Sequence, residues 1–340
     1  MNEDGPPLRI DMKMKVVALI FLLGITTRLS AQETPFLPKQ QGLKLPKKFM
    51  GFRKVQPLVG VLKTPLMLKN KHAKKDKGEL EKEDFSSFKW FGEELYYTVK
   101  VNGVEAVRSA VKVGDLRYKG DKPYVPVVGT AQSIGFFHAI YPMRDTANTF
   151  VSPLTLRPLR SEKNFHENGK KRHYAVDFIH TTYRARVNKI KFATKEGHKD
   201  IKRKFLKAIP GTTHDMLSWF FDLRKSGKMK IGDTFDYYLY DGWKLSRIQG
   251  KVVGKEDVYT SIGWFKTWRI DFTREVLRSK SKKKGTPPLL KVHQAAKPTG
   301  SLFISRDENL IPVSIRIDTK WGSTETTLMK YKLPIPARKK

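Results

Sequence analysis

The sequence of 340 residues contains no cysteine. This absence excludes a disulfide scaffold, a thiolate zinc site, a cysteine nucleophile and a lipid-modified cysteine. Acidic residues are scarce as well: 33 Asp and Glu face 67 Lys and Arg, so the net charge is +34. Because 39% of the residues are hydrophobic, the chain is too apolar to be wholly disordered. We therefore expect a folded protein that depends on its core alone.

Long hydrophobic runs are also missing. The apolar stretch from Val16 to Ile25 is about half as long as the roughly 20 residues that a membrane-spanning helix needs. It follows a basic start and precedes the small residue Ala31, which is the layout of a secretory signal peptide. We predict a signal peptide over residues 1–31, with translation starting at Met12 or Met14; the alternative is a buried or membrane-anchoring helix. The expected location is the periplasm, and the protein is not expected to be a lipoprotein.

The positive charge is unevenly distributed. Three stretches hold much of it: Gln32–Gly78 with a net charge of +10, Lys189–Lys207 with +6 and Arg278–Lys297 with +7. Runs of like charge without hydrophobic periodicity are typical of solvated arms and loops. We therefore divide the chain into a basic Pro/Lys-rich arm (32–84), a single β-rich domain (85–333) with a solvated basic insertion (278–297), and a basic tail (334–340).

From Phe85 onward, short alternating runs separated by turn dipeptides predict strands. Asn102-Gly103, Asn168-Gly169 and Asp241-Gly242 each fit a type I′ hairpin turn, because these residues accept positive φ. The predicted hairpin arms are Leu95–Val101 with Val104–Val113, Leu156–Phe165 with Lys170–Phe178, and Phe235–Tyr240 with Trp243–Val253. Further strands are expected at Tyr124–Thr130, Tyr183–Thr194, Ser261–Phe272, Gly300–Ser305, Val313–Asp318 and Ser323–Tyr331.

The expected fold is mainly β: an antiparallel meander that forms a half-open barrel, or a two-sheet β domain, with one amphipathic helix. The helix is predicted over 213–226, where apolar residues recur at helical spacing. Thr212 and Asp215 resemble a capping box, and Gly227 can end the helix in the left-handed conformation. A shorter helical turn is expected at Ile134–Ile140.

Five segments carry a family resemblance: GEELYYTVKVNGVEA at 92–106, TFVSPLTLRPLRSEKNF at 149–165, HDMLSWFFDLR at 214–224, KIGDTFDYYLYDG at 230–242 and SLFISRDENLIPVSIRI at 301–317. Taken in this order, they resemble the domain of unknown function 3108 family of exported proteins of Gram-negative bacteria. The resemblance covers Phe85 to Lys332. It implies an envelope-facing β domain and brings no established catalytic residues. The basic arm and the basic insertion depart from the family pattern.

Motifs that carry chemistry are absent from the sequence. It has no HExxH zinc site, no GxSxG elbow, no Walker loop and no GxGxxG after a strand. On a strand, His173 and His180 point to opposite faces, so a metal site with His166 is not expected. The SxxK pattern occurs at Ser86, Ser279 and Ser281 without its partner motifs. We predict no enzyme, no cofactor and no metal, and we keep a hydrolase as a remote alternative.

Charge beside aromatic residues is what remains. Export separates the chain from nucleic acid, so the expected partners are anionic envelope lipids or cell-wall polymers, with peripheral membrane contact. The candidate anion contacts are Lys202, Arg203, Lys204, Lys282, Lys283 and Lys284. We expect a non-enzymatic protein that binds an anionic or acyl-bearing envelope ligand.

The favoured hypothesis adds an apolar cleft that the amphipathic helix partly closes. Its candidate lining residues are Tyr97, Trp219, Phe220, Tyr238 and Trp264. For each of the five, a place in the plain hydrophobic core is the simpler interpretation. The alternative function is a scaffold that holds an acidic wall polymer or a membrane surface and has a filled core. A cavity of at least about 300 Å³ favours the carrier over the scaffold.

Overall fold

The computed structural model describes residues 85, 88–194, 198–280, 283–319 and 322–334. The predicted signal peptide, the basic arm, most of the basic tail and Lys282 lie outside the described residues. Within the described part of the chain, no helix has the length and apolarity needed to span a membrane.

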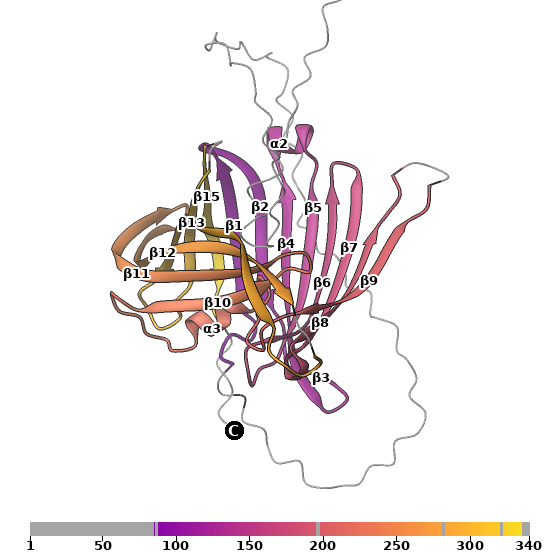
Figure 1. Ribbon diagram of the computed structural model, residues 1–340. Coiled ribbons are helices and arrows are strands. Elements are labelled where there is room, and N and C mark those ends of the chain that lie inside the picture. The colour runs from indigo at the N-terminus through magenta and orange to yellow at the C-terminus, as the bar shows by residue number, and fades with distance from the viewer. Residues whose placement is uncertain (1–84, 86–87, 195–197, 281–282, 320–321, 335–340) are drawn as a thin grey trace, which may run out of the picture. The chain divides into compact units, whose positions relative to one another are not determined.

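The described domain is one antiparallel sheet of 15 strands (Figure 1). Its order is β10-β11-β12-β13-β14-β15-β1-β2-β4-β5-β6-β7-β8-β9, with β3 paired only to β4. The sheet is not closed, because β10 and β9 form its two edges. The predicted antiparallel, half-open β fold is confirmed. The strands are β1 Glu94–Val101, β2 Val104–Val113, β3 Arg117–Lys119, β4 Lys122–Ser133, β5 Arg144–Val151, β6 Pro158–Glu167, β7 Lys170–Ile179, β8 Arg184–Lys191, β9 Ile201–Ala208, β10 Thr234–Tyr240, β11 Leu245–Thr260, β12 Gly263–Lys280, β13 Leu289–Ser305, β14 Pro312–Thr319 and β15 Gly322–Lys332.

All three predicted hairpins form, but one turn differs. Asn102 and Gly103 have φ of 49° and 82°, and Asn168 and Gly169 have φ of 44° and 72°, as a type I′ turn requires. In the third hairpin Tyr240 pairs with Leu245, so the turn has four residues instead of two. Asp241 Oδ1 accepts hydrogen bonds of 2.6 Å from the backbone N–H groups of Trp243 and Lys244. Its side chain therefore stabilises a longer turn than the Asp-Gly pair predicts.

Three strands, β3, β5 and β9, are not among those predicted from the sequence. The alternate residues of β5 that are buried include Asp145 and Thr149, so the strand lacks a hydrophobic alternation. β9 lies within the basic run from Lys189 to Lys207, and its first six residues are exposed. The described residues of the predicted basic insertion are mostly exposed, as expected, but most of them lie in strands, because β12 and β13 continue into the insertion as a paired ribbon.

The α-helix α3, Trp219–Arg224, is much shorter than predicted. The Thr212 capping box is wrong. Asp215 Oδ1 instead accepts the backbone N–H groups of Leu217 (3.3 Å) and Ser218 (2.9 Å), so the turn into the helix begins three residues later. Gly227, with φ of +65°, ends the segment as predicted. The predicted short turn is α2, Gly135–Ile140, and a 3-10 helix, η1, covers His180–Thr182.

The segment around α3 packs against both halves of the sheet. Leu217 and Phe221 belong to a buried cluster with side chains of β1, β2 and β4–β7. Met216, Trp219 and Leu223 belong to a second cluster with side chains of β10–β14. Each large side chain buried in this way contributes about 1.5–3 kcal/mol to stability. The apolar side chains of this segment are therefore buried in the core on both sides.

Candidate functional site

Two of the five predicted cleft residues, Tyr97 and Phe220, line a small pocket beside α3. Its volume is about 40 Å³. That space holds roughly three water molecules, whereas a small-molecule site has about 300–1,000 Å³. This pocket does not accommodate an acyl chain. The other lining residues are Glu93, Leu95, Val111, Leu217, Phe221, Arg224, Pro312, Ile315 and Thr326.

The other three predicted cleft residues lie elsewhere. Trp219 is 2% exposed, and its ring centroid is 4.2 Å from that of Phe220, so it is a core residue. Tyr238 is half-buried against a cluster formed mainly by β7 and β8. The prediction for Trp264 is wrong, because this side chain is 71% exposed next to the β11–β12 turn. Strand alternation decides which face a residue occupies, and the shift of register between Val252 and Gly254 makes the face of this hairpin hard to predict.

A buried ion pair fixes the end of α3. The Arg224 guanidinium donates to both carboxylate oxygens of Glu93, at 2.8 and 2.6 Å, and both side chains are 2% exposed. Its Nε and Nη2 also donate to the Asn309 carbonyl, at 3.1 and 2.9 Å. Charge and hydrogen bonds are therefore satisfied together. The pair joins the helix to β1 and to the β13–β14 turn, and we assign it to structure rather than to chemistry.

A serine and a histidine lie together just before α3. Ser218 Oγ is 3.3 Å from His214 Nδ1, and it also accepts the backbone N–H of Asp215 at 3.1 Å. Ser218 is 0% and His214 3% exposed, so neither is accessible to a substrate. Burial lowers the pKa of His214 to about 4, which keeps the imidazole neutral. In the described residues, no group of three or more His, Cys, Asp or Glu side chains could hold a metal ion.

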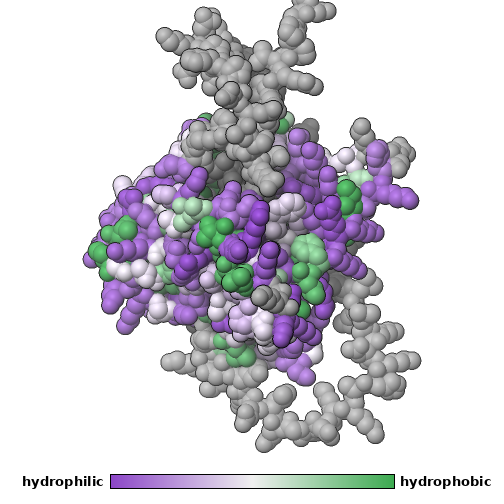
Figure 2. Space-filling model, in the orientation of Figure 1, coloured by the Kyte–Doolittle hydropathy of each residue, from purple (hydrophilic) through white to green (hydrophobic). Residues whose placement is uncertain are grey.

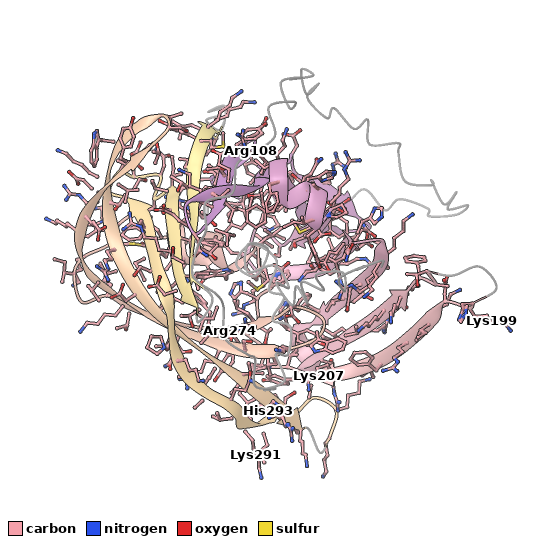
Figure 3. The ribbon with its side chains drawn as sticks, turned by 90° about the horizontal axis from the view of Figure 1, so that it is seen from above. Arg108, Lys199, Lys207, Arg274, Lys291 and His293 are labelled. Carbon is pink, nitrogen blue, oxygen red and sulfur yellow. The ribbon has the colours of Figure 1, made fainter. Side chains whose placement is uncertain are left out.

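The predicted anion contacts do not form one site. Lys202, Arg203 and Lys204 are exposed on β9, and Lys283 and Lys284 are exposed in the turn between β12 and β13. In Figure 3, Lys199, just before β9, and Lys291, on β13, lie well apart. Strand alternation also separates Arg203 from its two neighbours, which point to the opposite face of β9. Only Arg203 remains as part of a compact group of cations.

That group lies on the inner face of β7–β9, by which we mean the face that carries the buried core. We call it the cation cluster: Arg172 on β7, Lys189 and Lys191 on β8, and Arg203 on β9. Lys189 pairs directly with Arg203, and Lys191 with Arg172, so the four side chains share one face. Like charges placed directly opposite each other destabilise a sheet. Of these four residues only Arg203 is predicted from the sequence, although Lys189 and Lys191 alternate within the basic run.

An exposed aromatic ring borders the cation cluster. Lys189 Nζ is 3.6 Å from the centroid of the Trp243 ring and 4.9 Å from that of Tyr174. Trp243 is 62% exposed, so its ring is accessible to a ligand. Burial, together with Arg172, Arg203 and Lys191, lowers the pKa of Lys189 to about 8, against an opposing effect of Asp241. The crowded cations therefore repel one another in the absence of a bound anion.

A buried lysine anchors the turn that carries Trp243. Lys163 on β6 is 2% exposed, and its Nζ donates to the Asp241 carbonyl at 3.3 Å. Burial lowers the pKa of this lysine. Because the Asp241 side chain also accepts the N–H of Trp243, Lys163 holds the turn in place and Trp243 beside Lys189. We interpret Lys163 as a positioning residue.

The carboxylates near the cation cluster lie on one side only. Glu167 forms an ion pair with Arg172, and these side chains are 10% and 26% exposed. Asp145 on β5 is fully buried; burial and the neighbouring Glu167 raise its pKa to about 8. Lys191 and Arg203 have no ion-pair partner among the residues that the structure describes. The cluster therefore carries excess positive charge toward β9.

Comparison with known proteins gives one family. The family model described as "Protein of unknown function (DUF3108)" matches residues 96–329. No curated protein matches the sequence.

Three solved structures show weak likenesses, and each covers 72% of this chain. A β-barrel-like protein of the domain of unknown function DUF1849 from Brucella abortus has 10% identity, a TM-score of 0.40 and 98% of its own chain covered. A "putative lipoprotein" from Parabacteroides distasonis has 11% identity, a TM-score of 0.29 and 96% of its own chain covered. A "putative exported protein" with YmcC-like fold from Bacteroides fragilis has 11% identity, a TM-score of 0.26 and 98% of its own chain covered. We draw neither fold nor function from TM-scores this low.

Proposed function

Because the chain belongs to the DUF3108 family, for which no function is known, we propose its function from the geometry of the inner face. It is a non-enzymatic cell-envelope protein that binds an anionic ligand at the cation cluster of Arg172, Lys189, Lys191 and Arg203. The observation that carries this proposal is the like-charge pairing of Lys189 with Arg203 beside the exposed ring of Trp243. Such an arrangement weakens the sheet unless an anion compensates it.

The chemistry of the cluster favours a phosphate or a carboxylate carried on a larger group. Arginine presents a planar fork that matches both anions, and the lysines add point charges. The Trp243 face can pack against the apolar surface of the group that bears the anion. Since the pKa of Lys189 is about 8, most of this lysine is charged at neutral pH. A bound anion should raise that pKa further.

The ligand is held at the surface rather than enclosed. The pocket beside α3 is too small for an acyl chain, and Trp219 and Leu223 of α3 are buried in the core. In the envelope, phospholipid headgroups and acidic wall polymers present the required anions. A protein that binds the polymer acts as a scaffold, whereas one that binds headgroups is a peripheral membrane protein. Both functions use the same four cations, and they differ in what carries the anion.

The test uses the full-length chain and two charge reversals of equal size. K189E/R203E reverses two of the four cations of the cation cluster, and K202E/K204E reverses two cations on the other face of β9. The probes are vesicles that contain phosphatidylglycerol and, separately, polygalacturonate, both at about 50 mM salt, where screening is weak. Each cation near an anionic surface contributes about 1 kcal/mol, so K189E/R203E should weaken binding at least about tenfold. K202E/K204E should weaken it less than about threefold.

The two probes distinguish the two sources of the anion. Loss of vesicle binding alone favours a headgroup, and loss of polygalacturonate binding alone favours a polymer. Equal losses in K189E/R203E and K202E/K204E would mean that only diffuse positive charge attracts the probes, and the proposal would then be wrong. The same holds if wild-type binding is unaffected by about 0.5 M salt.

A further inference from the structure

The edge strand β9 ends the sheet with an unpaired side. β9 pairs with β8 from Ile201 to Ala208, and no other described strand follows it. Ser279 Oγ on β12 donates a hydrogen bond to the Ala208 carbonyl at the end of β9, so the exposed edge is limited to its first six residues. At about 3.3 Å per residue, this edge is roughly 20 Å long. Along this edge, alternate backbone N–H and C=O groups point away from β8. The edge therefore offers hydrogen bonds to a further strand, which is the mode known as β-augmentation.

The side chains of β9 are unlike those of a protected edge. Lysine on an edge strand usually prevents pairing, and β9 does carry Lys202 and Lys204. It also exposes three large apolar side chains: Ile201 is 51%, Phe205 41% and Leu206 58% exposed. On the face seen in Figure 2, most surface side chains are hydrophilic and hydrophobic ones form small separate groups. Exposing three such residues within six positions of one strand is costly unless a partner covers them.

The charge of β9 decides what kind of strand can bind. The strand contains four cations and no carboxylate: Lys202, Arg203, Lys204 and Lys207. A second copy of β9 placed against it would bring like charges opposite each other on both faces, which is unfavourable. A strand with acidic residues on one face would instead form ion pairs with Lys202 and Lys204, while apolar residues on its other face cover Ile201 and Phe205.

We propose that β9 is a docking edge for an extended acidic segment of a partner protein, which adds to the sheet as a further strand. Backbone hydrogen bonds supply affinity that does not depend on the partner's side chains. Lys202 and Lys204 add specificity, because they attract acidic side chains on the outer face. The outer face of β9 lies opposite the cation cluster, with Arg203 as the shared boundary. The docking edge can therefore exist whether or not the cation cluster binds a ligand.

The experiment measures binding of a synthetic peptide of alternating Glu and Val, about nine residues long, to the full-length chain. The comparison peptide alternates Glu and Pro. It keeps the charge but cannot pair as a strand, because proline lacks the backbone N–H. We expect the Glu-Val peptide to bind at least tenfold more tightly than the Glu-Pro peptide. Hydrogen exchange at alternate amides between 201 and 207 should slow when the Glu-Val peptide is bound.

Protein variants locate the effect. K202E/K204E should weaken Glu-Val binding at least tenfold, and Phe205→Ser, on the face that meets the Val side chains, should weaken it about threefold. The matched control is K119E/K122E, which reverses two exposed lysines that face each other in the β3–β4 hairpin and should leave binding unchanged. All four lysines are exposed, so thermal unfolding should be nearly the same in both double variants.

Three results would overturn the docking edge. The first is equal binding of the Glu-Val and Glu-Pro peptides, since charge alone would then explain the affinity. The second is protection of the β9 amides by anionic vesicles and by no peptide, which would make the edge a membrane contact. The third is a dimer of the chain that K202E/K204E disrupts. Loss of anion binding in K189E/R203E with peptide binding retained would separate the docking edge from the proposed function.

Discussion

At the end of α3, the guanidinium of Arg224 is closed to solvent and meets a carboxylate and a carbonyl, whereas on the inner face of β7–β9 four cations stand together with a carboxylate on one side only. In the first region the low dielectric makes every unpaired charge costly, so the structure pairs them all. In the second region, solvent reaches the side chains and screens the repulsion between the cations.

The difference separates charges that hold the fold from charges that are available to a ligand. Arg224 has no donor left for another molecule at its Nε and Nη2, which already bind Asn309. Lys191 and Arg203 have no ion-pair partner in the described part of the chain, and Trp243 exposes its ring nearby. Arg172 of the cation cluster is intermediate between these cases, because Glu167 partly neutralises its charge. Substitutions in both regions, at Arg224, Asp145 and Arg203, test this comparison.

The largest effect is expected from Arg224→Met. The substitution leaves the Glu93 carboxylate buried and without its partner, which typically costs 3–5 kcal/mol. We therefore expect the free energy of unfolding to fall by about 3–5 kcal/mol, measured by urea denaturation followed by circular dichroism. Probe binding at the cation cluster should be unchanged at temperatures where the variant is folded.

The double variant R224M/E93L is the control for that prediction. Replacing a buried ion pair by apolar side chains of similar volume is often neutral or stabilising. The double variant should therefore recover most of the stability that Arg224→Met loses. If Arg224→Met cost less than about 1 kcal/mol, the pair would behave like a surface ion pair, and the contrast between the two regions would collapse.

The fold was more predictable from the sequence than the site. Local rules found the first two hairpins, because Asn102 and Asn168 each precede a glycine and the turn geometry demands such residues. They missed β5, whose buried residues include Asp145, because no hydrophobic alternation marks a strand whose inward side chains are polar. They also made α3 too long, because the helical spacing of apolar residues continues through turns that Asp215 closes.

The site required pairing between strands, which local patterns do not supply. Lys189 and Arg203 are adjacent only because β8 and β9 pair in one particular register. Trp243 joins them from a turn whose length the Asp-Gly rule did not predict. The buried pair of Glu93 and Arg224 is likewise set by tertiary packing across 131 residues of sequence.

An intermediate effect is expected at Asp145, on the side of the cation cluster that carries carboxylates. Its pKa is about 8 in the folded chain against an ordinary value of 3.8. Between these values the folded chain keeps a proton that the unfolded chain has lost, so stability falls as pH rises and levels off above about pH 8. One such proton corresponds to a slope of up to about 1.4 kcal/mol per pH unit.

Asp145→Asn removes that proton from both states. The difference in unfolding free energy between wild type and this variant should therefore shift in favour of the variant from pH 5 to pH 8. Glu162→Gln, which changes a half-exposed carboxylate on β6, is the matched control and should show no such shift. A constant difference across the range would mean that Asp145 is ionised in the folded chain and that Glu167 and Arg172 form an isolated pair.

The smallest effect, and the one of opposite sign, is expected from Arg203→Thr. Removing one of two like charges that face each other across β8 and β9 should stabilise the chain by about 0.2–1 kcal/mol at low salt. The gain should shrink at about 0.5 M salt, where screening already weakens the repulsion. Lys202→Thr is the matched control, because Lys202 faces the uncharged Ile190, and it should give no gain. A loss of stability in Arg203→Thr would show that the repulsion between the cations is already compensated in the free protein. A bound anion would then have no repulsion to relieve, and the main argument for the anion site would fail.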